Sequence, residues 1–166
     1  MTSRAIRPLL FLDVDGPLIP FGRPGGYPTY GAPDGPNPLL ARLDPAYGPR
    51  LTALPCELVW ATTWMSDANE CVAPLLGLPE LPVVTWLDPA EPDERAGLHW
   101  KTRTLVEWAA GRPFAWVDDE ITAIDRTWVA AHHPGQALLH RVDPREGLTE
   151  ADFAALGEWR SRVSGS

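Results

Sequence analysis

Two pairs of aspartates are the residues of this sequence whose spacing most directly suggests chemistry. Asp13 and Asp15 lie two residues apart directly after an apolar run, and Asp118 and Asp119 follow another apolar run later in the chain. Four carboxylates gathered in one place would repel one another unless a hard divalent cation with oxygen ligands sat among them. Mg²⁺ takes only one or two carboxylates, which leaves an aspartate for covalent or proton-transfer work. The pairs therefore predict a Mg²⁺ site with a reactive acid beside it.

Lys101 and a pair of threonines supply the other groups such a site needs. Lys101 is the single lysine among 14 basic residues. Because an ammonium is not interchangeable with a guanidinium beside a phosphoryl group, this isolation favours a role in the site over an ordinary solvated position. Thr62 and Thr63 follow a further apolar run, and the sequence leaves open which hydroxyl binds an anionic oxygen.

Short apolar runs predict the elements that must position these residues. Buried strands are expected at 8–13, 56–62, 82–86, 114–117 and 136–141. Helices are expected near 39–54, 66–76, 99–110, 121–132 and 149–162. We expect interruptions of the first helix at Pro45 and Pro49, a cap on the second at Ser66, and a capping box of Thr149 and Asp152 on the last.

This alternation predicts an α/β fold, a Rossmann-like three-layer sandwich whose parallel sheet of about five strands carries helices on both faces. We expect one domain over residues 1–166. Ligands of such sheets bind beyond the carboxyl ends of the strands. The polar residues that end three of the strands should therefore meet there: Asp13 and Asp15, Thr62 or Thr63, and Asp118 with Asp119. Residues 16–38 hold six glycines and seven prolines, which predicts a loop over the rim of that site.

Composition excludes several classes of protein. The 166 residues carry a formal net charge of -8, which argues against a strong nucleic-acid-binding surface. No apolar stretch approaches the roughly 18 residues of a membrane helix, so no membrane association is expected. Two cysteines without metal-ligand spacing fit a reducing, cytoplasmic setting. The oligomeric state is left open.

Four motifs, in this order, resemble those of the haloacid dehalogenase-like (HAD) phosphohydrolase superfamily. An apolar strand followed by Asp-x-Asp-Gly lies at 9–16, and a strand ending in threonine lies at 58–62. Lys101 at the start of a helix matches the third motif, and a strand ending in paired acids at 116–119 matches the fourth. The joint order and spacing are far more specific than any one motif.

The resemblance implies a Mg²⁺-dependent phosphatase that works through an aspartyl phosphate on a phosphorylated substrate. Asp13 would be the nucleophile, and Asp15 would protonate the leaving group and then activate water. Thr62 would bind a phosphoryl oxygen, while Lys101 would balance the negative charge of the transferring group.

The same resemblance implies the metal ligands. Mg²⁺ would be held by the Asp13 carboxylate, the backbone carbonyl of Asp15 and Asp119, with Asp118 behind Asp119. Further residues expected to contact the substrate are Gly16, Thr63 and Trp64.

Two features depart from the commoner pattern of the superfamily. Pro17 stands where threonine or valine is usual, so the turn after Asp15 is expected to be stiffer. The segments between the motifs are too short for a folded cap domain, and an uncapped site suits bulky or macromolecular substrates.

The stretch 60–64, followed by Ala68 and Asn69, is also similar to a small capless HAD group associated with RNA-repair proteins. That similarity implies a phosphatase acting on nucleotides or nucleic-acid ends, although the acidic net charge opposes it. Trp64 would either stack on a base or sugar or simply pack at the turn between strand and helix.

Two other functions remain in view. A signalling receiver domain also gathers acids, a threonine and a lysine around Mg²⁺, but in receivers the lysine comes last, whereas here Lys101 precedes Asp118. The other alternative is a non-catalytic binding module that has kept the fold without turnover. Hydrolysis of a phosphomonoester, or its absence, distinguishes these alternatives.

Overall fold

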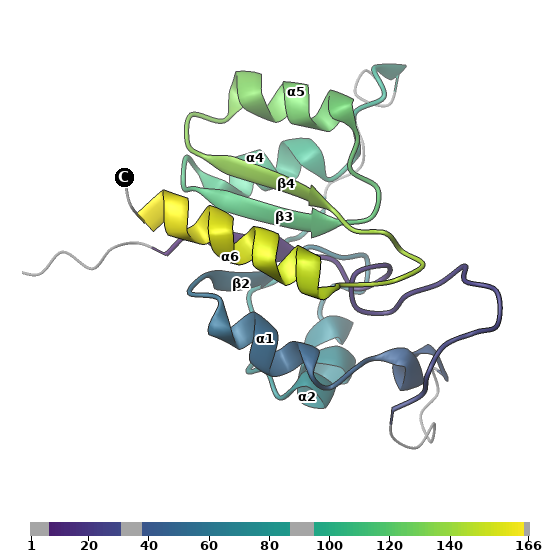
Figure 1. Ribbon diagram of the computed structural model, residues 1–166. Coiled ribbons are helices and arrows are strands. Elements are labelled where there is room, and N and C mark those ends of the chain that lie inside the picture. Colours follow the sequence, from purple (N-terminus) through teal and green to yellow (C-terminus); the bar gives the residue numbers. More distant parts are fainter. Residues whose placement is uncertain (1–6, 31–37, 87–94, 165–166) are drawn as a thin grey trace, which may run out of the picture.

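Four parallel strands form the sheet, in the order β2-β1-β3-β4 (Figure 1). The computed structural model describes residues 7–30, 38–86 and 95–164. The strands are β1 (Leu9–Leu12), β2 (Glu57–Trp60), β3 (Phe114–Asp118) and β4 (Ala137–Arg141). β1 is buried along its whole length and lies between β2 and β3. The residues that follow β1 therefore emerge between the ends of its two neighbours, at the carboxyl edge of the sheet.

The expected strand at 82–86 is wrong, and the sheet has one strand fewer than predicted. Val83 forms only an isolated parallel bridge to Trp60 beside β2. Pro82 has no backbone N–H and cannot extend the ladder, so only two backbone hydrogen bonds link this segment to Trp60.

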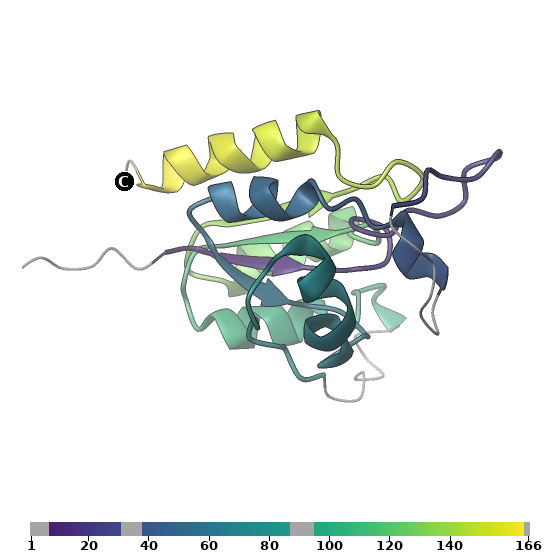
Figure 2. The same ribbon diagram turned by 90° about the horizontal axis from the view of Figure 1, so that it is seen from below.

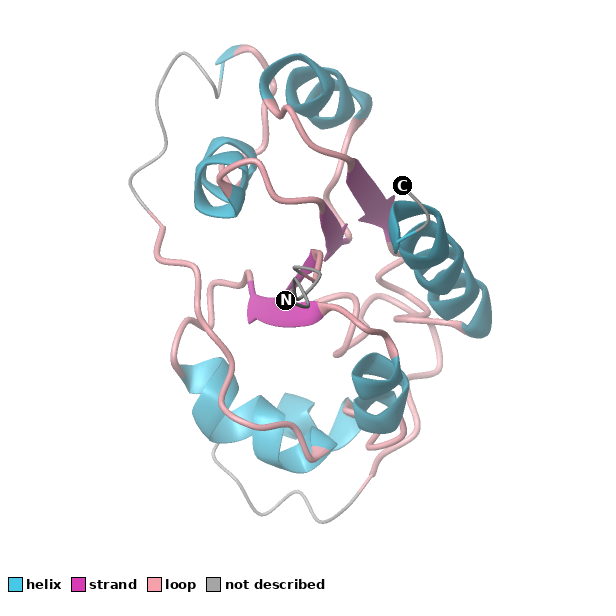
Figure 3. Ribbon diagram, turned by 90° about the vertical axis from the view of Figure 1, so that its left-hand side faces the viewer, coloured by secondary structure: helices cyan, strands magenta, loops and turns pink. Residues whose placement is uncertain are grey.

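Helices cover both faces of the sheet, as the sequence predicts (Figures 2 and 3). In chain order they are the 3-10 helix η1 (Pro38–Arg42), α1 (Tyr47–Ala53), the π-helical turn η2 (Ala68–Val72), α2 (Ala73–Leu76), α4 (Thr102–Ala109), α5 (Ala123–His132) and α6 (Glu150–Ser164). In Figure 2, α1 and α6 lie on one side of the sheet and α4 on the other. No additional folded domain interrupts the described residues.

Alternating side chains of the strands build two separate cores. Leu10 and Leu12 of β1 face the core shared with α1, α2 and α6. Leu9 and Phe11 face the opposite core, shared with α4 and α5. This two-residue period is what a strand buried on both faces requires, and it fixes the register that positions the residue after Leu12.

Prolines account for the two helices that differ from expectation. Pro49 does not interrupt α1 but lies in its first turn, where a missing N–H costs nothing. In the second helix, Pro74 cannot donate to the preceding turn, and the chain forms the wide turn η2 before α2. Ser66 precedes that turn without capping it, whereas Thr149 and Asp152 form the expected reciprocal bonds at the start of α6.

Two further points concern the helices and the segment 16–38. Within the described residues, no helix combines the length and apolar character that crossing a bilayer demands. The glycine- and proline-rich segment 16–38 is described up to residue 30, and the rest of the expected loop, 31–37, lies outside the described residues.

Candidate active site

The register of the three central strands brings two aspartates to one level. Leu12 of β1 pairs with Trp60 of β2 and with Val117 of β3. The next residue along, Asp13, therefore lies beside Asp118 at the carboxyl edge of the sheet. Their exposed fractions are 6% and 0%, so both carboxyl groups must be satisfied inside the protein.

Lys101 provides the positive charge for this pair. Its Nζ donates to Oδ2 of Asp118 at 2.7 Å and to the carbonyl of Ala61 at 2.9 Å, and it lies 3.4 Å from Oδ1 of Asp13. Burial alone would lower the pKa of Lys101, but the two carboxylates outweigh it and hold the pKa above its usual value. One buried ammonium therefore joins the ends of β1, β2 and β3.

Asp125 fixes the turn that carries Lys101. This fully buried residue accepts hydrogen bonds at Oδ1 from the His99 backbone and the Thr102 hydroxyl, both at 2.8 Å. Its Oδ2 accepts from the backbone of Thr122, which completes a capping box at the start of α5. Asp125 was not predicted from the sequence, although the spacing Thr-x-x-Asp from Thr122 is typical of a capping box and could have identified it.

Asp13, Asp118 and Asp119 form a cluster that fits a divalent cation. One carboxylate oxygen of each lies within 4.8 Å of the others. Burial raises the pKa of Asp13 to about 8, with Lys101 opposing this rise and Asp118 adding to it. Burial and the charge of Asp118 raise the pKa of Asp119 to about 6. Lys101 alone does not neutralise the three carboxyl groups of the cluster. Their carboxylate oxygens are the ligands that Mg²⁺ prefers.

A second group, His99 with Asp118 and Glu120, is less suited to a metal. The backbone N–H of Lys101 donates to Nδ1 of His99 at 3.1 Å, which places the proton of the neutral ring on Nε2. That nitrogen lies 3.5 Å from a Glu120 oxygen. A protonated nitrogen cannot bind a cation, so this group lacks the donor that its histidine would have to supply.

A tryptophan holds the carboxylate of Asp15 by a hydrogen bond. The indole N–H of Trp64 donates to Oδ2 of Asp15 at 3.1 Å. Trp64 is partly buried and also packs against the core on the side of α1 and α6, as in the packing alternative for this residue. The hydrogen bond to Asp15 was not foreseen, and it gives the acid a defined direction.

The catalytic hollow, as we call the depression at this edge, has a volume of about 210 Å³. Its lining residues are Asp13, Asp15, Phe21, Thr63, Trp100, Lys101, Asp119 and Glu120. Phe21 and Trp100 were not identified from the sequence. Phe21 belongs to the predicted rim loop and Trp100 directly precedes Lys101, so position along the chain was the available signal.

Gly16 and the two threonines occupy different depths. A Cβ on Gly16 would lie 2.8 Å from Cγ of Asp119, and the backbone there has φ +100, so glycine lets the loop approach the acid closely. Thr62 is fully buried, and its hydroxyl oxygen accepts from the backbone of Trp64 at 3.2 Å. Thr63 is the threonine that lines the catalytic hollow.

Comparison with known proteins gives one result that covers most of the chain. Residues 9–153 match the family described as the HAD domain in Swiss Army Knife RNA repair proteins. No curated protein and no solved structure matches the chain. The family match confirms the resemblance inferred from the four motifs and supports a hydrolase of the phosphatase type. Fold, motif order and this match together show that the chain belongs to the HAD domains of Swiss Army Knife RNA repair proteins.

Proposed function

We propose that this protein is a Mg²⁺-dependent phosphomonoesterase that forms an aspartyl phosphate, a mixed anhydride, on Asp13. The observation that carries the proposal is the pairing of Asp13 with Lys101, at 3.4 Å, beside a separately held Asp15. A nucleophile, a fixed cation and a proton donor then surround one hollow.

In the first step, a carboxylate oxygen of Asp13 attacks the phosphorus and the bond from phosphorus to the leaving oxygen breaks. Asp15 donates its proton to that oxygen, so the alcohol leaves neutral. Lys101 balances the charge of Asp13 and of the transferring group. Mg²⁺ held by Asp13, Asp119 and the Asp15 carbonyl would neutralise further charge on the phosphoryl oxygens.

In the second step, Asp15 takes a proton from water as the water oxygen attacks phosphorus. The bond from phosphorus to Asp13 breaks, which regenerates the carboxylate and releases inorganic phosphate. The Thr63 hydroxyl would donate to a phosphoryl oxygen, because Thr63 lines the catalytic hollow, and the fully buried Thr62 is the alternative donor.

The proposed substrates are nucleotides or nucleic-acid ends. The family is that of HAD domains in RNA repair proteins, and the aromatic residues Phe21 and Trp100 line the catalytic hollow, where a base could stack. Cys56 and Cys71 are both free thiols, which fits the proposed cytoplasmic location.

The test compares wild type with Asp13→Asn and Asp15→Asn on p-nitrophenyl phosphate and on phosphorylated oligonucleotides, with Mg²⁺ or EDTA. Each substitution should lower kcat by at least roughly a hundredfold with little change in folding, which circular dichroism checks. Acid quenching and mass spectrometry should find phosphate on Asp13 in wild type.

Three outcomes would contradict the proposal in different ways. Near-normal turnover by Asp13→Asn would remove the covalent step. A phosphoprotein that persists for minutes to hours would indicate a receiver-like domain. No Mg²⁺-dependent hydrolysis of any of these phosphomonoesters would indicate a binding module.

A further inference from the structure

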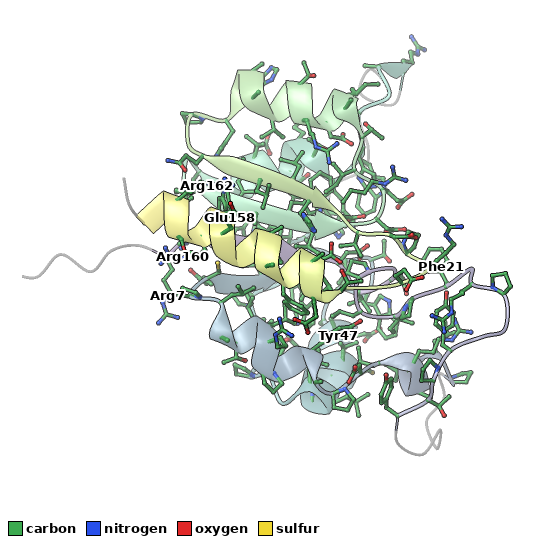
Figure 4. All side chains as sticks on the ribbon, in the orientation of Figure 1. Arg7, Phe21, Tyr47, Glu158, Arg160 and Arg162 are labelled. Atoms are coloured by element: carbon green, nitrogen blue, oxygen red, sulfur yellow. The ribbon has the colours of Figure 1, made fainter. Side chains whose placement is uncertain are left out.

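A second and larger depression adjoins the catalytic hollow. We call it the arginine hollow; it has a volume of about 570 Å³. Its lining residues are Phe21, Gly22, Arg141, Asp143, Pro144 and Arg145. Phe21 also lines the catalytic hollow, so one ring is a wall of both. In Figure 4 the Phe21 label lies at the carboxyl end of the sheet, away from Arg7, Arg160 and Arg162.

Arg141 connects the arginine hollow to the metal-binding cluster. It is the last residue of β4 and pairs in register with Asp118. Its Nε donates to the backbone carbonyl of Asp119 at 3.2 Å. Its two terminal nitrogens have no hydrogen-bond partner among the described residues, and the side chain is exposed. The guanidinium is therefore anchored at one edge and keeps donors for a ligand.

Arg145 lies on a loop that is hydrogen-bonded to the segment carrying Phe21, another lining residue of the arginine hollow. The backbone N–H of Phe21 donates to the carbonyl of Pro144 at 2.8 Å, which ties the rim segment to this loop. Arg145 pairs with Asp143 at 3.4 Å, with side chains 65% and 48% exposed. An ion pair so exposed contributes little, so an incoming anion can replace the carboxylate at small cost.

We propose that the arginine hollow binds a second, unreactive phosphate of the substrate, one nucleotide away from the phosphate that is removed. This rests on the proposed function and narrows its substrate class to polynucleotide ends. Arg141 and Arg145 present planar donor groups that match phosphate oxygens, and Phe21 offers a ring for the base between the two phosphates.

Charge explains why such a subsite is useful here. The catalytic hollow is lined by several carboxylates, and the chain carries a net charge of -8, so nucleic acid is repelled over most of the surface. Two arginines beside the site attract the substrate only where its end must lie. The proposal is therefore compatible with the lack of a broad nucleic-acid-binding surface predicted from the sequence.

The kinetic test compares 5′- and 3′-phosphorylated dinucleotides with the corresponding nucleoside monophosphates. Wild type should show the lower KM for at least one dinucleotide. We expect Arg145→Ala to raise the ratio of dinucleotide to mononucleotide KM by about threefold, and Arg141→Ala with Arg145→Ala to raise it by about tenfold. The ratio cancels any change common to both substrates.

Arg162→Ala is the matched control. Arg162 pairs with Glu158 at 3.8 Å, and its side chain is 66% exposed, close to the value for Arg145. It lies on α6 far from Phe21 (Figure 4). This variant should leave both KM values unchanged. If it raises the ratio as much as Arg145→Ala does, the effect is one of overall charge and the proposal is wrong.

Binding to the Asp13→Asn protein separates the subsite from turnover. A fluorescein-labelled, phosphate-terminated dinucleotide should bind about tenfold more weakly when both arginines are replaced, and its affinity should depend less on salt. Unchanged binding and an unchanged KM ratio would overturn the subsite even if hydrolysis through Asp13 is established. Weaker binding without any hydrolysis would support the subsite while the proposed function fails.

Discussion

The two ends of the sheet each carry a depression, and the two depressions differ in size and in whether buried charged groups line them. At the amino end, a depression of about 400 Å³ runs along the segment that leads into β2 and is bordered largely by apolar residues, including Leu51, Leu54 and Leu58. At the carboxyl end, the catalytic hollow has only about 210 Å³ but contains buried Asp13 and Lys101. The larger space thus lacks buried charge, and buried charge rather than volume distinguishes the site.

The ion pairs of the two ends show the same contrast. Arg112 and Glu57 pair at 2.9 Å at the amino end, with side chains 30% and 44% exposed. Lys101 and Asp118 pair at 2.7 Å at the carboxyl end, with side chains 3% and 0% exposed. Solvent screens the first pair, whereas removing one partner of the second leaves an uncompensated buried charge. Substitutions at the two ends should therefore have different consequences.

The largest effect is expected when Lys101 is replaced. Lys101→Arg keeps the charge, but a planar guanidinium cannot fit the three acceptors that surround Nζ in a buried position. We expect kcat to fall by at least about a hundredfold, as when one donor to a developing charge is lost. Arg112→Lys, the reverse exchange at the amino end, should leave kcat unchanged. Full activity of Lys101→Arg would show that the point charge is not required.

A smaller effect is expected from Trp64→Phe, which keeps an aromatic ring but removes the hydrogen bond to Asp15. A poorly directed acid matters most when the leaving group needs a proton. We expect kcat for an alkyl phosphate to fall roughly tenfold, while kcat for p-nitrophenyl phosphate, whose leaving group needs little protonation, changes by less than about twofold.

Trp60→Phe is the control for Trp64→Phe. It also removes an indole donor, but this donor forms its 2.9 Å hydrogen bond with Asn69 and not with Asp15. Its stability should fall while the ratio of the two kcat values stays as in wild type. Equal losses on both substrates in Trp64→Phe would show that Trp64 does not act through Asp15.

The parts of the fold that follow from regular patterns could be predicted from the sequence. Apolar runs located β1, β2, β3 and β4, because strands buried on both faces leave a continuous hydrophobic signal. The predictions of a strand at 82–86 and of one continuous helix at 66–76 were wrong at Pro82 and Pro74. Each of these prolines lacks the backbone N–H that the regular hydrogen-bonding pattern requires. The hydrophobic pattern of the side chains gives no sign of this missing donor.

In the candidate site, residues at strand ends could be brought together from sequence, because parallel strands end at a common edge. Asp13 and Asp118 are such residues. Phe21, Trp100 and the bond from Trp64 to Asp15 depend on how loops pack over that edge, and no periodic pattern encodes loop packing. The choice between Thr62 and Thr63 likewise depends on a turn.

Magnesium should stabilise the protein more at high pH than at low pH. Burial raises the pKa of Asp13 to about 8 and that of Asp119 to about 6. Because the raised values exceed those of the unfolded chain, the metal-free protein loses stability as pH rises from about 4 towards 8. Mg²⁺ binds the ionised groups, so it should raise Tm by about 3 °C more at pH 8 than at pH 5.

Thermal unfolding of wild type and Asp13→Asn at both pH values, with and without Mg²⁺, measures this difference. Asp13→Asn should lose most of the pH dependence of the magnesium effect, since it lacks the group with the largest shift. A shift in Tm that is equal at pH 5 and pH 8 would show that Mg²⁺ does not bind at these carboxylates.

The smallest effect is expected at the amino end, where Glu57→Gln removes the exposed partner of Arg112. We expect the free energy of unfolding to fall by at most about 1 kcal/mol, with kcat/KM unchanged. Asp13→Asn should do the reverse: it should raise the free energy of unfolding of the metal-free protein at pH 8, because it removes a carboxylate whose ionised form the fold disfavours, and it should abolish the activity measured with Mg²⁺. Urea unfolding and steady-state kinetics on both variants make the comparison. If Asp13→Asn instead destabilises the protein more than Glu57→Gln does, the buried charge of Asp13 does not lower the stability of the fold. The proposed contrast between the two ends of the sheet would then be wrong.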